Sequence, residues 1–246
     1  MPAPVGVQCR ECVSEANAEL PHPVTNRVRN VFRPRGSTPV VTYSLIGLCV
    51  VVYGLQWLLG SSFTSLIVYY APFTVSQPWR WLTSMFAHSP TNPLHLILNM
   101  YTLYLFGPVI ESLVGRLRFL VLYLVSGYAA TVAVLFLAPS APVLGASGAI
   151  FGLMGAYFVI ARHLGGNQTQ IIVVIAINLG FGFLVPGISW QAHVGGVLAG
   201  VAVAAVYVAT RRRAQRTAQI LGVVGIVVAL LVLTAVGILL LSSGGQ

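Results

Sequence analysis

The chain has 246 residues, of which 57% are hydrophobic and only 7% are charged. Soluble domains carry about 25% charged residues, so this composition excludes an ordinary soluble fold. The apolar residues form long continuous runs, whereas the strands of a membrane β-barrel would alternate apolar and polar residues. Lipid offers no partners to backbone N–H and C=O groups, so such runs must be helical. We therefore predict an all-α polytopic membrane protein.

Seven apolar runs approach or exceed the roughly 20 helical residues that cross a hydrocarbon core of about 30 Å. They fall near residues 40–60, 93–114, 117–138, 147–164, 169–187, 191–210 and 219–241. The N-terminal tail, residues 1–39, is polar and lacks the apolar core of a cleaved signal peptide. We therefore expect the first run to be a retained helix.

The N-terminal tail contains a lone C-x-x-C, formed by Cys9 and Cys12. A structural zinc site has four ligands, so this pair is at most half of one. His22 could supply a third ligand, and a tail with two idle cysteines is the alternative. No other metal site is expected.

The placement of arginine predicts the orientation in the membrane. All 13 basic residues are arginines, and nearly all lie in the tail or in every second connection, at residues 27–35, 116–118, 162 and 211–216. The intervening connections 139–146 and 187–190 carry no charge. Because cytoplasmic loops are rich in basic residues, we expect a cytoplasmic N-terminus and an external C-terminus. The net charge of +9 then reflects orientation, and no nucleic-acid partner is expected because the cations are dispersed.

The segment 61–92 is unusual for a connection because it is rich in aromatic residues and contains three prolines, while Arg80 is its only charge. Aromatic side chains gather at membrane–water interfaces. We interpret the segment as a structured loop whose short amphipathic helices lie partly in the membrane. A soluble external loop is the alternative, and the scarcity of charge disfavours it.

Four polar side chains from three predicted helices share one depth. With a rise of about 1.5 Å per residue, counting from the cytoplasmic arginines places Ser147 roughly 22 Å and His193 roughly 27 Å above the inner face. The same count places Asn99 at about 26 Å and His95 at about 31 Å, and their spacing puts both on one helix face. Polar groups inside spans are costly, so this cluster indicates a functional site.

Ser147 and His193 suit nucleophilic catalysis, because a neutral histidine can take the proton of a serine hydroxyl. The chain has no aspartate, and its glutamates lie in the tail except for Glu111. Glu111 lies 12 residues, or about 18 Å, deeper than Asn99 along the same helix, so no carboxylate can complete a triad. The sequence therefore predicts a Ser-His dyad.

Three further residues could stabilise an oxyanion. Gly145 permits a tight backbone that aims peptide N–H groups, and His95 and Asn99 offer side-chain donors. Taken singly, each polar residue, Ser147 and His193 included, could instead serve only in helix packing.

Two pairs of glycines predict that the helices of Ser147 and His193 pack closely. Gly148 and Gly152 follow the serine, and Gly196 and Gly200 follow the histidine, each pair with small-x-x-x-small spacing. Such pairs let helix backbones approach each other. This contact would bring the serine hydroxyl to the imidazole.

These residues, in this order, resemble the rhomboid family of intramembrane serine proteases over about residues 40–210. The matching motifs are Gly145-Ala146-Ser147-Gly148 for G-x-S-G, Ala192-His193 with Gly196 and Gly200 for A-H-x-x-G-x-x-x-G, His95 to Asn99 for H-x-x-x-N, Trp79-Arg80 for the Trp-Arg pair of the first loop, and Gly107 with Glu111 for G-x-x-x-E. Phe151 falls where many members have a tyrosine stacked on the base. His88 resembles an additional loop histidine, although its gap to His95 is longer than usual.

The resemblance implies an organisation as well as a fold. It implies a core of six transmembrane helices in residues 40–210, a basic linker at 211–218 and a seventh helix in 219–246, which is the 6+1 arrangement. The tail of residues 1–39 resembles the end of a zinc-ribbon extension found on some bacterial members, with its first cysteine pair missing. A bacterial plasma membrane is the expected location, since no organellar presequence is recognised and arginine wholly replaces lysine, as GC-rich genomes favour.

The resemblance also implies an activity. Ser147 and His193 would hydrolyse a peptide bond in or near the membrane segment of a transmembrane substrate, without a metal or cofactor. Gly145, His95 and Asn99 would support the oxyanion. The segment 61–92 and the end of the helix 169–187 would flank substrate access.

Two other functions are weighed against this one. A catalytically inactive rhomboid-like protein would bind transmembrane clients, but here both members of the dyad are present. A small-solute transporter would be expected to show internal repeats and a polar site at mid-membrane; no repeat is found, and the polar cluster lies toward one face. The oligomeric state is left open.

Overall fold

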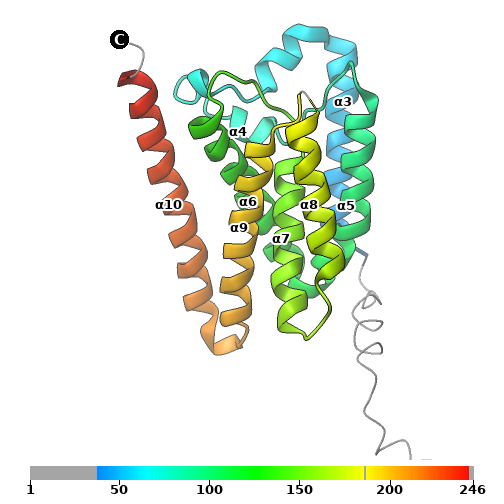
Figure 1. The fold of residues 1–246 in the computed structure, drawn as a ribbon, viewed down its shortest axis with the longest axis vertical. Helices are drawn as coiled ribbons and strands as arrows, with labels where there is room; N and C mark the ends of the chain where they lie inside the picture. The colour runs from blue at the N-terminus through cyan, green and yellow to red at the C-terminus, as the bar shows by residue number, and fades with distance from the viewer. Residues whose placement is uncertain (1–37, 186, 244–246) are drawn as a thin grey trace, which may run out of the picture. The chain divides into compact units, whose positions relative to one another are not determined.

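The computed structural model of the protein describes residues 38–185 and 187–243. Within these ranges the long helices are α3 (Val40–Ile67), α5 (Pro93–Val114), α6 (Arg116–Leu137), α7 (Ser147–His163), α8 (Thr169–Leu184), α9 (Trp190–Ala209) and α10 (Arg216–Ser243) (Figure 1). Three short helical elements, η1 (Ala71–Phe73), α4 (Arg80–Thr83) and η2 (Arg213–Gln215), lie in the connections. The predicted zinc ligands Cys9, Cys12 and His22 lie outside the described residues.

Each predicted apolar run coincides with one of the long helices, which confirms a polytopic helical membrane protein. Among the described residues, α3, α5, α6, α9 and α10 are long and apolar enough to cross a membrane. The helices α7 and α8 have 17 and 16 residues, slightly fewer than the roughly 20 that a perpendicular crossing needs. The chain is thus a multi-pass membrane protein, and its orientation and domain boundaries stay predictions.

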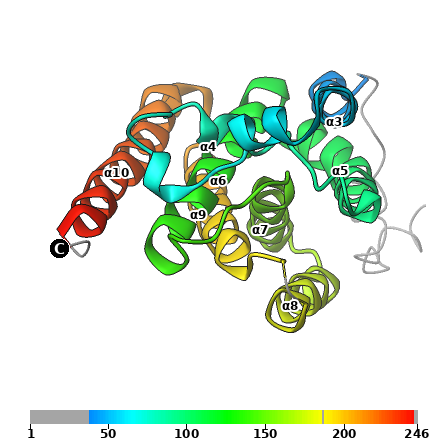
Figure 2. The same ribbon diagram turned by 90° about the horizontal axis from the view of Figure 1, so that it is seen from above.

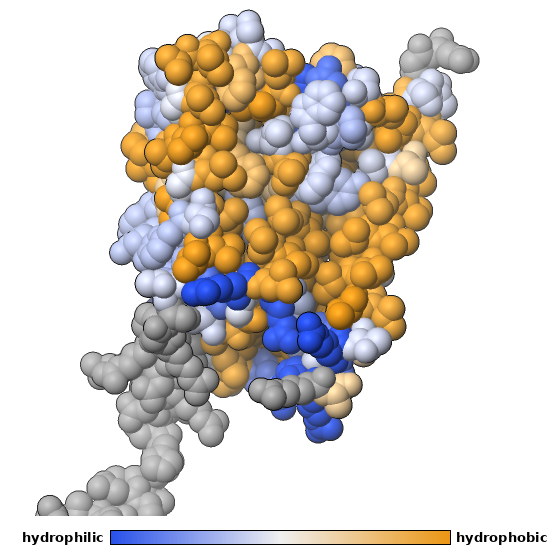
Figure 3. Space-filling model, turned by 180° about the vertical axis from the view of Figure 1, so that it is seen from behind, coloured by the Kyte–Doolittle hydropathy of each residue, from blue (hydrophilic) through white to orange (hydrophobic). Residues whose placement is uncertain are grey.

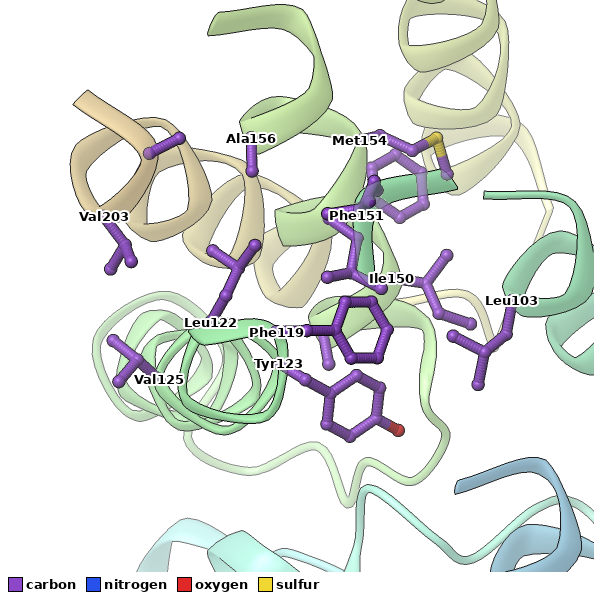
Figure 4. Packing of buried hydrophobic residues seen from close by; sticks show 14 of the residues in the cluster. Leu103, Phe119, Leu122, Tyr123, Val125, Ile150, Phe151, Met154, Ala156 and Val203 are labelled. Carbon is purple, nitrogen blue, oxygen red and sulfur yellow. The ribbon is translucent and has the colours of Figure 1, made fainter. Parts of the chain in front are cut away.

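Helix α7 lies at the centre of the bundle, among α5, α6, α8 and α9 (Figure 2). Phe119 and Tyr123 of α6 pack in one buried cluster with Ile150 of α7, and Leu103 of α5 and Val203 of α9 also belong to it (Figure 4). Because neighbouring helices cover α7 on several sides, it is apolar nearly all round. This central position places its first residue, Ser147, among the other helices.

Helices α7 and α9 touch through their backbones. A Cβ atom built on Gly196 would lie 1.9 Å from the carbonyl oxygen of Gly148, and one on Gly200 would lie 1.9 Å from that of Gly152. No real Cβ atom approaches an oxygen so closely, so only glycine fits at these two positions of α9. The predicted close packing of these two helices is confirmed.

Helix α3 extends to Ile67, but its backbone is kinked at Gly60, where the predicted apolar run 40–60 ends. At Gly60 the backbone has φ 74° and ψ −162°, which interrupts the helix before it resumes in a new direction. The apolar run ends there, but the hydroxyls of Thr64 and Ser65 bond to carbonyl oxygens three or four residues back and helical turns continue. Hydropathy alone cannot distinguish such a kink from a helix end.

The segment 61–92 is structured, as predicted, and Arg80 anchors it. One guanidinium nitrogen of Arg80, Nη1, donates to the carbonyl oxygens of Ser65 and Val68 at 2.5 and 2.7 Å, and the group lies 5.0 Å from the ring centroid of Phe73. A cation is favoured where the last carbonyls of a helix lack partners. Arg80 therefore ties the loop to the end of α3, while the depth of this loop in the membrane stays a prediction.

Hydrophilic residues gather at the end of the bundle that holds the α7–α8 and α9–α10 connections (Figure 3). There Glu111 of α5 accepts bonds from the backbone N–H groups of Val41 and Thr42 at 3.1 and 2.8 Å and from the Thr42 hydroxyl at 2.7 Å. Gly107 makes room for this threonine, because a Cβ at residue 107 would lie 2.5 Å from the Thr42 methyl group. The G-x-x-x-E motif thus caps the start of α3, and Glu111 is structural rather than catalytic.

Helix α10 packs on α6 and α9 at the edge of the bundle (Figure 1). The hydroxyls of Tyr128 and Thr234 lie 2.6 Å apart, and Arg118 Nε donates to Gln219 Oε1 at 2.7 Å. Most of its large apolar side chains are exposed, as expected of a helix that faces lipid. Nothing on α10 reaches the predicted site.

Candidate active site

A cavity of about 630 Å³ opens among α5, α6, α7, α8 and α9. The predicted residues Ser147, His193, His95, Asn99 and Gly145 all line it. Phe151 and Ser84 contribute further parts of the wall. The prediction that these polar groups from three helices meet is therefore confirmed, while their chemical roles stay predictions.

Ser147 and His193 are in direct contact. The serine Oγ lies 3.0 Å from the imidazole Nε2, which is hydrogen-bonding distance. Ser147 is the first residue of α7, where the N–H groups of the first turn lack partners within the helix. His193 lies in the first turn of α9, next to the glycine contacts that bring the two helices together. The pair has the geometry of a nucleophile and its base.

The far side of the imidazole has no carboxylate partner. Its Nδ1 atom is buried and forms no hydrogen bond with any described residue. Glu111, which is the one carboxylate in the described part of the chain, is engaged with Thr42 at the start of α3. The ring is held instead by Phe151, with centroids 4.0 Å apart and planes at 11°. This arrangement fits a dyad oriented by stacking.

Gly145 occupies a position that only glycine can fill. Its φ of 125° is rarely adopted by residues with a side chain. A Cβ atom there would also lie 2.8 Å from His95 Nε2. The Gly145 N–H donates to the carbonyl oxygen of Ser84 at 2.9 Å, so this N–H is not free to point at a ligand.

The two polar residues of α5 that line the cavity differ in their hydrogen-bond partners. Asn99 Nδ2 donates to the backbone oxygen of His95, one turn earlier, at 2.7 Å. An amide nitrogen carries two hydrogens, so one of them bonds the helix of Asn99 itself, and the role of Asn99 as an oxyanion donor stays a prediction. His95 Nδ1 accepts from the Ser89 N–H at 3.4 Å, and its Nε2 lies beside Gly145.

His88 lies next to the site but does not line the cavity. It is fully buried, its ring centroid is 5.2 Å from that of His95, and its N–H donates to Gln56 Oε1 at 3.0 Å. Burial, helped by the neighbouring His95 and opposed by a bond to the Phe86 carbonyl, lowers the pKa of His88 from 6.5 to about 4. The imidazole is therefore neutral at physiological pH.

Sequence reasoning missed Gln56. Gln56 is the one amide in the apolar run 40–60, and a polar side chain inside a span was signal enough to ask for its partner. Asn178 of α8 lines the cavity, although its Nδ2 donates to the Val174 carbonyl at 2.8 Å on the same helix. No group of three or more His, Cys, Asp or Glu side chains that could hold a metal occurs within the described residues.

Fold and site together define a class of protein: a multi-pass helical membrane protein with a serine and a histidine in contact inside the bundle. A family model described as the Rhomboid domain matches residues 75–210. The chain belongs to the rhomboid family.

Several curated proteins are similar to this chain. Rhomboid protease GluP of Bacillus subtilis is 35% identical over 178 residues, which cover 68% of this chain and 34% of that protein. RHOMBOID-like protein 6, mitochondrial, of Arabidopsis thaliana is 37% identical over 136 residues, covering 51% of this chain and 42% of that protein. Rhomboid protease GlpG of Haemophilus influenzae is 25% identical over 170 residues, covering 65% of this chain and 87% of that protein. The chain thus spans less than half the length of the first two relatives.

Proposed function

We propose that the protein is an intramembrane serine endopeptidase that works with the Ser147–His193 dyad. The observation that carries this proposal is the 3.0 Å contact between Ser147 Oγ and His193 Nε2 inside the cavity. The names of the relatives GluP and GlpG, both called rhomboid proteases, support the same activity. The substrate would be a transmembrane protein cleaved in or near its membrane segment.

In the first half of the reaction, Ser147 Oγ attacks the scissile carbonyl carbon while His193 Nε2 takes the hydroxyl proton. The carbonyl oxygen becomes an oxyanion, which accepts hydrogen bonds from the Ser147 N–H at the start of α7 and from His95 Nε2. The C–N bond then breaks, and the imidazolium gives its proton to the leaving amine. An acyl-enzyme on Ser147 remains.

In the second half, a water molecule attacks the acyl carbon and gives a proton to His193 Nε2. Collapse of this second oxyanion breaks the bond to Ser147 Oγ, which takes the proton back. Asn99 would add a further donor through the amide hydrogen that does not bond the His95 carbonyl. Phe151 keeps the imidazole plane aimed at the serine throughout, because it stacks on the ring.

A catalytically inactive protein that binds transmembrane clients is the alternative. Such a protein needs the cavity and an exposed apolar surface for a client helix, but it does not need the dyad. Phe183 and Leu184, exposed at the end of α8, offer apolar surface to a client helix in either case. Only chemistry at Ser147 separates the two functions.

The test is covalent labelling of the detergent-solubilised protein by a fluorophosphonate probe, which reacts with activated serines. We expect labelling of the wild type and of Ser112→Ala, a control serine on α5 whose hydroxyl bonds the Val109 carbonyl of its own helix. Ser147→Ala should not be labelled, and the labelling rate of His193→Ala should fall by about 100-fold or more. Equal labelling of all four proteins would overturn the proposal.

Labelling is then followed by cleavage of reporter proteins with one transmembrane segment, reconstituted with the enzyme in liposomes. Cleavage by the wild type and Ser112→Ala, but not by Ser147→Ala, is the expected result. Binding of the reporters without cleavage by the wild type would instead favour the client-binding alternative.

A further inference from the structure

Gln56 is a buried amide that links α3 to the active-site loop. Only 1% of its surface is exposed. Its Oε1 accepts from the His88 N–H at 3.0 Å, and its Nε2 donates to Thr64 Oγ1 at 3.3 Å, across the kink at Gly60. Asn99 and Asn178 each donate to a carbonyl oxygen of their own helix, whereas Gln56 reaches a residue 32 positions away.

The hydrogen bond from the His88 N–H to Gln56 fixes the backbone at residue 88, and the N–H of the next residue is also a donor. His88 is followed by Ser89, whose N–H donates to Nδ1 of His95 at 3.4 Å. The His88 ring also packs on the His95 ring, with centroids 5.2 Å apart. The loop therefore meets His95 at two points, and Gln56 holds that part of the loop against α3.

This contact decides which nitrogen of His95 carries the proton. A neutral imidazole has one N–H donor and one bare acceptor nitrogen, and a nitrogen that accepts a hydrogen bond cannot be the protonated one. Because Nδ1 accepts from Ser89, the proton is on Nε2. That atom lies beside Gly145, and the His95 side chain lines the cavity that contains Ser147.

We infer that Gln56 is a positioning residue, which acts through the backbone of His88 and Ser89 to keep His95 in the Nε2–H form that can donate to the oxyanion. The catalytic consequence rests on the proposed function, whereas the state of His95 does not. Without the Gln56 acceptor the His88 N–H is left unpaired in a buried place, so the loop must shift to find a partner. A shifted loop withdraws the Ser89 N–H and leaves both forms of His95 available.

The first measurement reads the proton on His95 directly. Protein labelled with ¹⁵N-histidine is studied by NMR in detergent micelles near pH 8, where neutral imidazoles prevail, since their ordinary pKa is about 6.5. Protonated and bare ring nitrogens have well-separated shifts, and the spectrum of His95→Asn assigns the signal. We expect the Nε2–H form in the wild type. A wild type in the Nδ1–H form would overturn the inference, whatever the variants do.

The variants compare two bonds of the same amide. Gln56→Met removes both bonds at similar volume, and Thr64→Val removes only the bond from Nε2 and leaves the His88 acceptor intact. Gln56→Met should show a mixture of the two forms, together with a kcat about 10-fold lower and a KM within about twofold of the wild type, since a misplaced oxyanion donor costs less than a deleted one. Thr64→Val should keep the wild-type spectrum and a kcat within about twofold of the wild type.

Two outcomes for Gln56→Met would overturn the inference. One is a wild-type spectrum and rate, and the other is a lower rate with an unchanged spectrum, which would leave Gln56 a purely structural role. If the wild type cleaves no reporter at all, the proposed function fails and the NMR spectra alone decide whether Gln56 sets the state of His95.

Discussion

Helices α7 and α9 bring Ser147 and His193 together through contacts of backbone on backbone, at Gly148 with Gly196 and at Gly152 with Gly200. Helix α5 borders the same cavity but leaves many of its large apolar side chains exposed, and its His95 is held by one hydrogen bond and one ring contact from a loop. The first region, the contact between α7 and α9, has no side chain at its closest points that could move to make room. The second region, the contact between the loop and α5, depends on single hydrogen bonds.

This difference separates the two parts of the proposed chemistry. The distance between nucleophile and base is set by rigid helix packing, because a glycine contact cannot be loosened by a rotamer change. The position of the oxyanion donor is set by a loop, which Gln56 and Arg80 tie to α3. Substitutions in the first region should unfold the protein, and substitutions in the second should mainly change its activity or its response to pH.

The largest expected effect is on the rigid region. In Gly200→Ala the new methyl group would meet the Gly152 carbonyl oxygen, so we expect a loss of about 3 kcal/mol or more of unfolding free energy, or no folded protein. The control is Gly180→Ala on α8, where a Cβ has nothing within 4 Å and alanine favours the helix by up to about 1 kcal/mol. Thermal unfolding in detergent measures both, and equal melting temperatures would show that the two helices are not in backbone contact.

The second prediction concerns the junction of the two regions. Gly145→Ala must strain a φ of 125° and push on the His95 ring, so reporter cleavage should fall by about 100-fold to 1000-fold, as when an oxyanion donor is lost. Gly165→Ala is the matched control, because Gly165 also has a positive φ of 75° but a Cβ there has no neighbour within 4 Å. It should lose some stability and keep its rate within about twofold of the wild type. A similar loss of rate in both variants would mean that backbone strain, rather than the approach to His95, matters.

The third and smallest effect tests the loop by pH. Because the pKa of His88 is about 4 in the folded protein and about 6.5 when unfolded, the unfolded chain binds more protons between these values. The stability that comes from the neutral, buried ring is complete above about pH 6.5 and is lost as the pH falls toward about 4, by up to about 3 kcal/mol. We expect the melting temperature of the wild type to fall more between about pH 7 and about pH 4.5 than that of His88→Gln, which cannot titrate there. Parallel curves for the two proteins would contradict the burial of His88.

Much of the rigid region could be predicted from the sequence, because its signals are local and repeat along the chain. The small-x-x-x-small pairs identify two helices that pack closely, and counting residues from the arginines brings Ser147 and His193 to one depth. The same counting excludes Glu111 from the site. Such patterns are informative in a membrane, since all transmembrane helices lie roughly along the membrane normal and have the same rise per residue.

The loop region could be predicted only in outline. The aromatic and proline content of 61–92 indicates a structured loop, but not that α3 resumes after Gly60, nor that Gln56 reaches His88. Nor does the spacing of His95 and Asn99 show that the Asn99 amide donates to the His95 carbonyl, because spacing places a side chain on a helix face without saying which acceptor it finds. Hydrogen bonds between distant residues leave no periodic trace in a sequence.

The sequence by itself determined the class of this protein, its helices and the pair Ser147 and His193, because composition, hydropathy and glycine spacing act through short-range rules. Only the tertiary structure decided that the Gly145 N–H bonds the Ser84 carbonyl, that Gly145 leaves room for His95, and that the Ser89 N–H of a loop bonded to Gln56 donates to that histidine. These contacts join segments far apart in the chain. Their geometry exists only once the helices have packed.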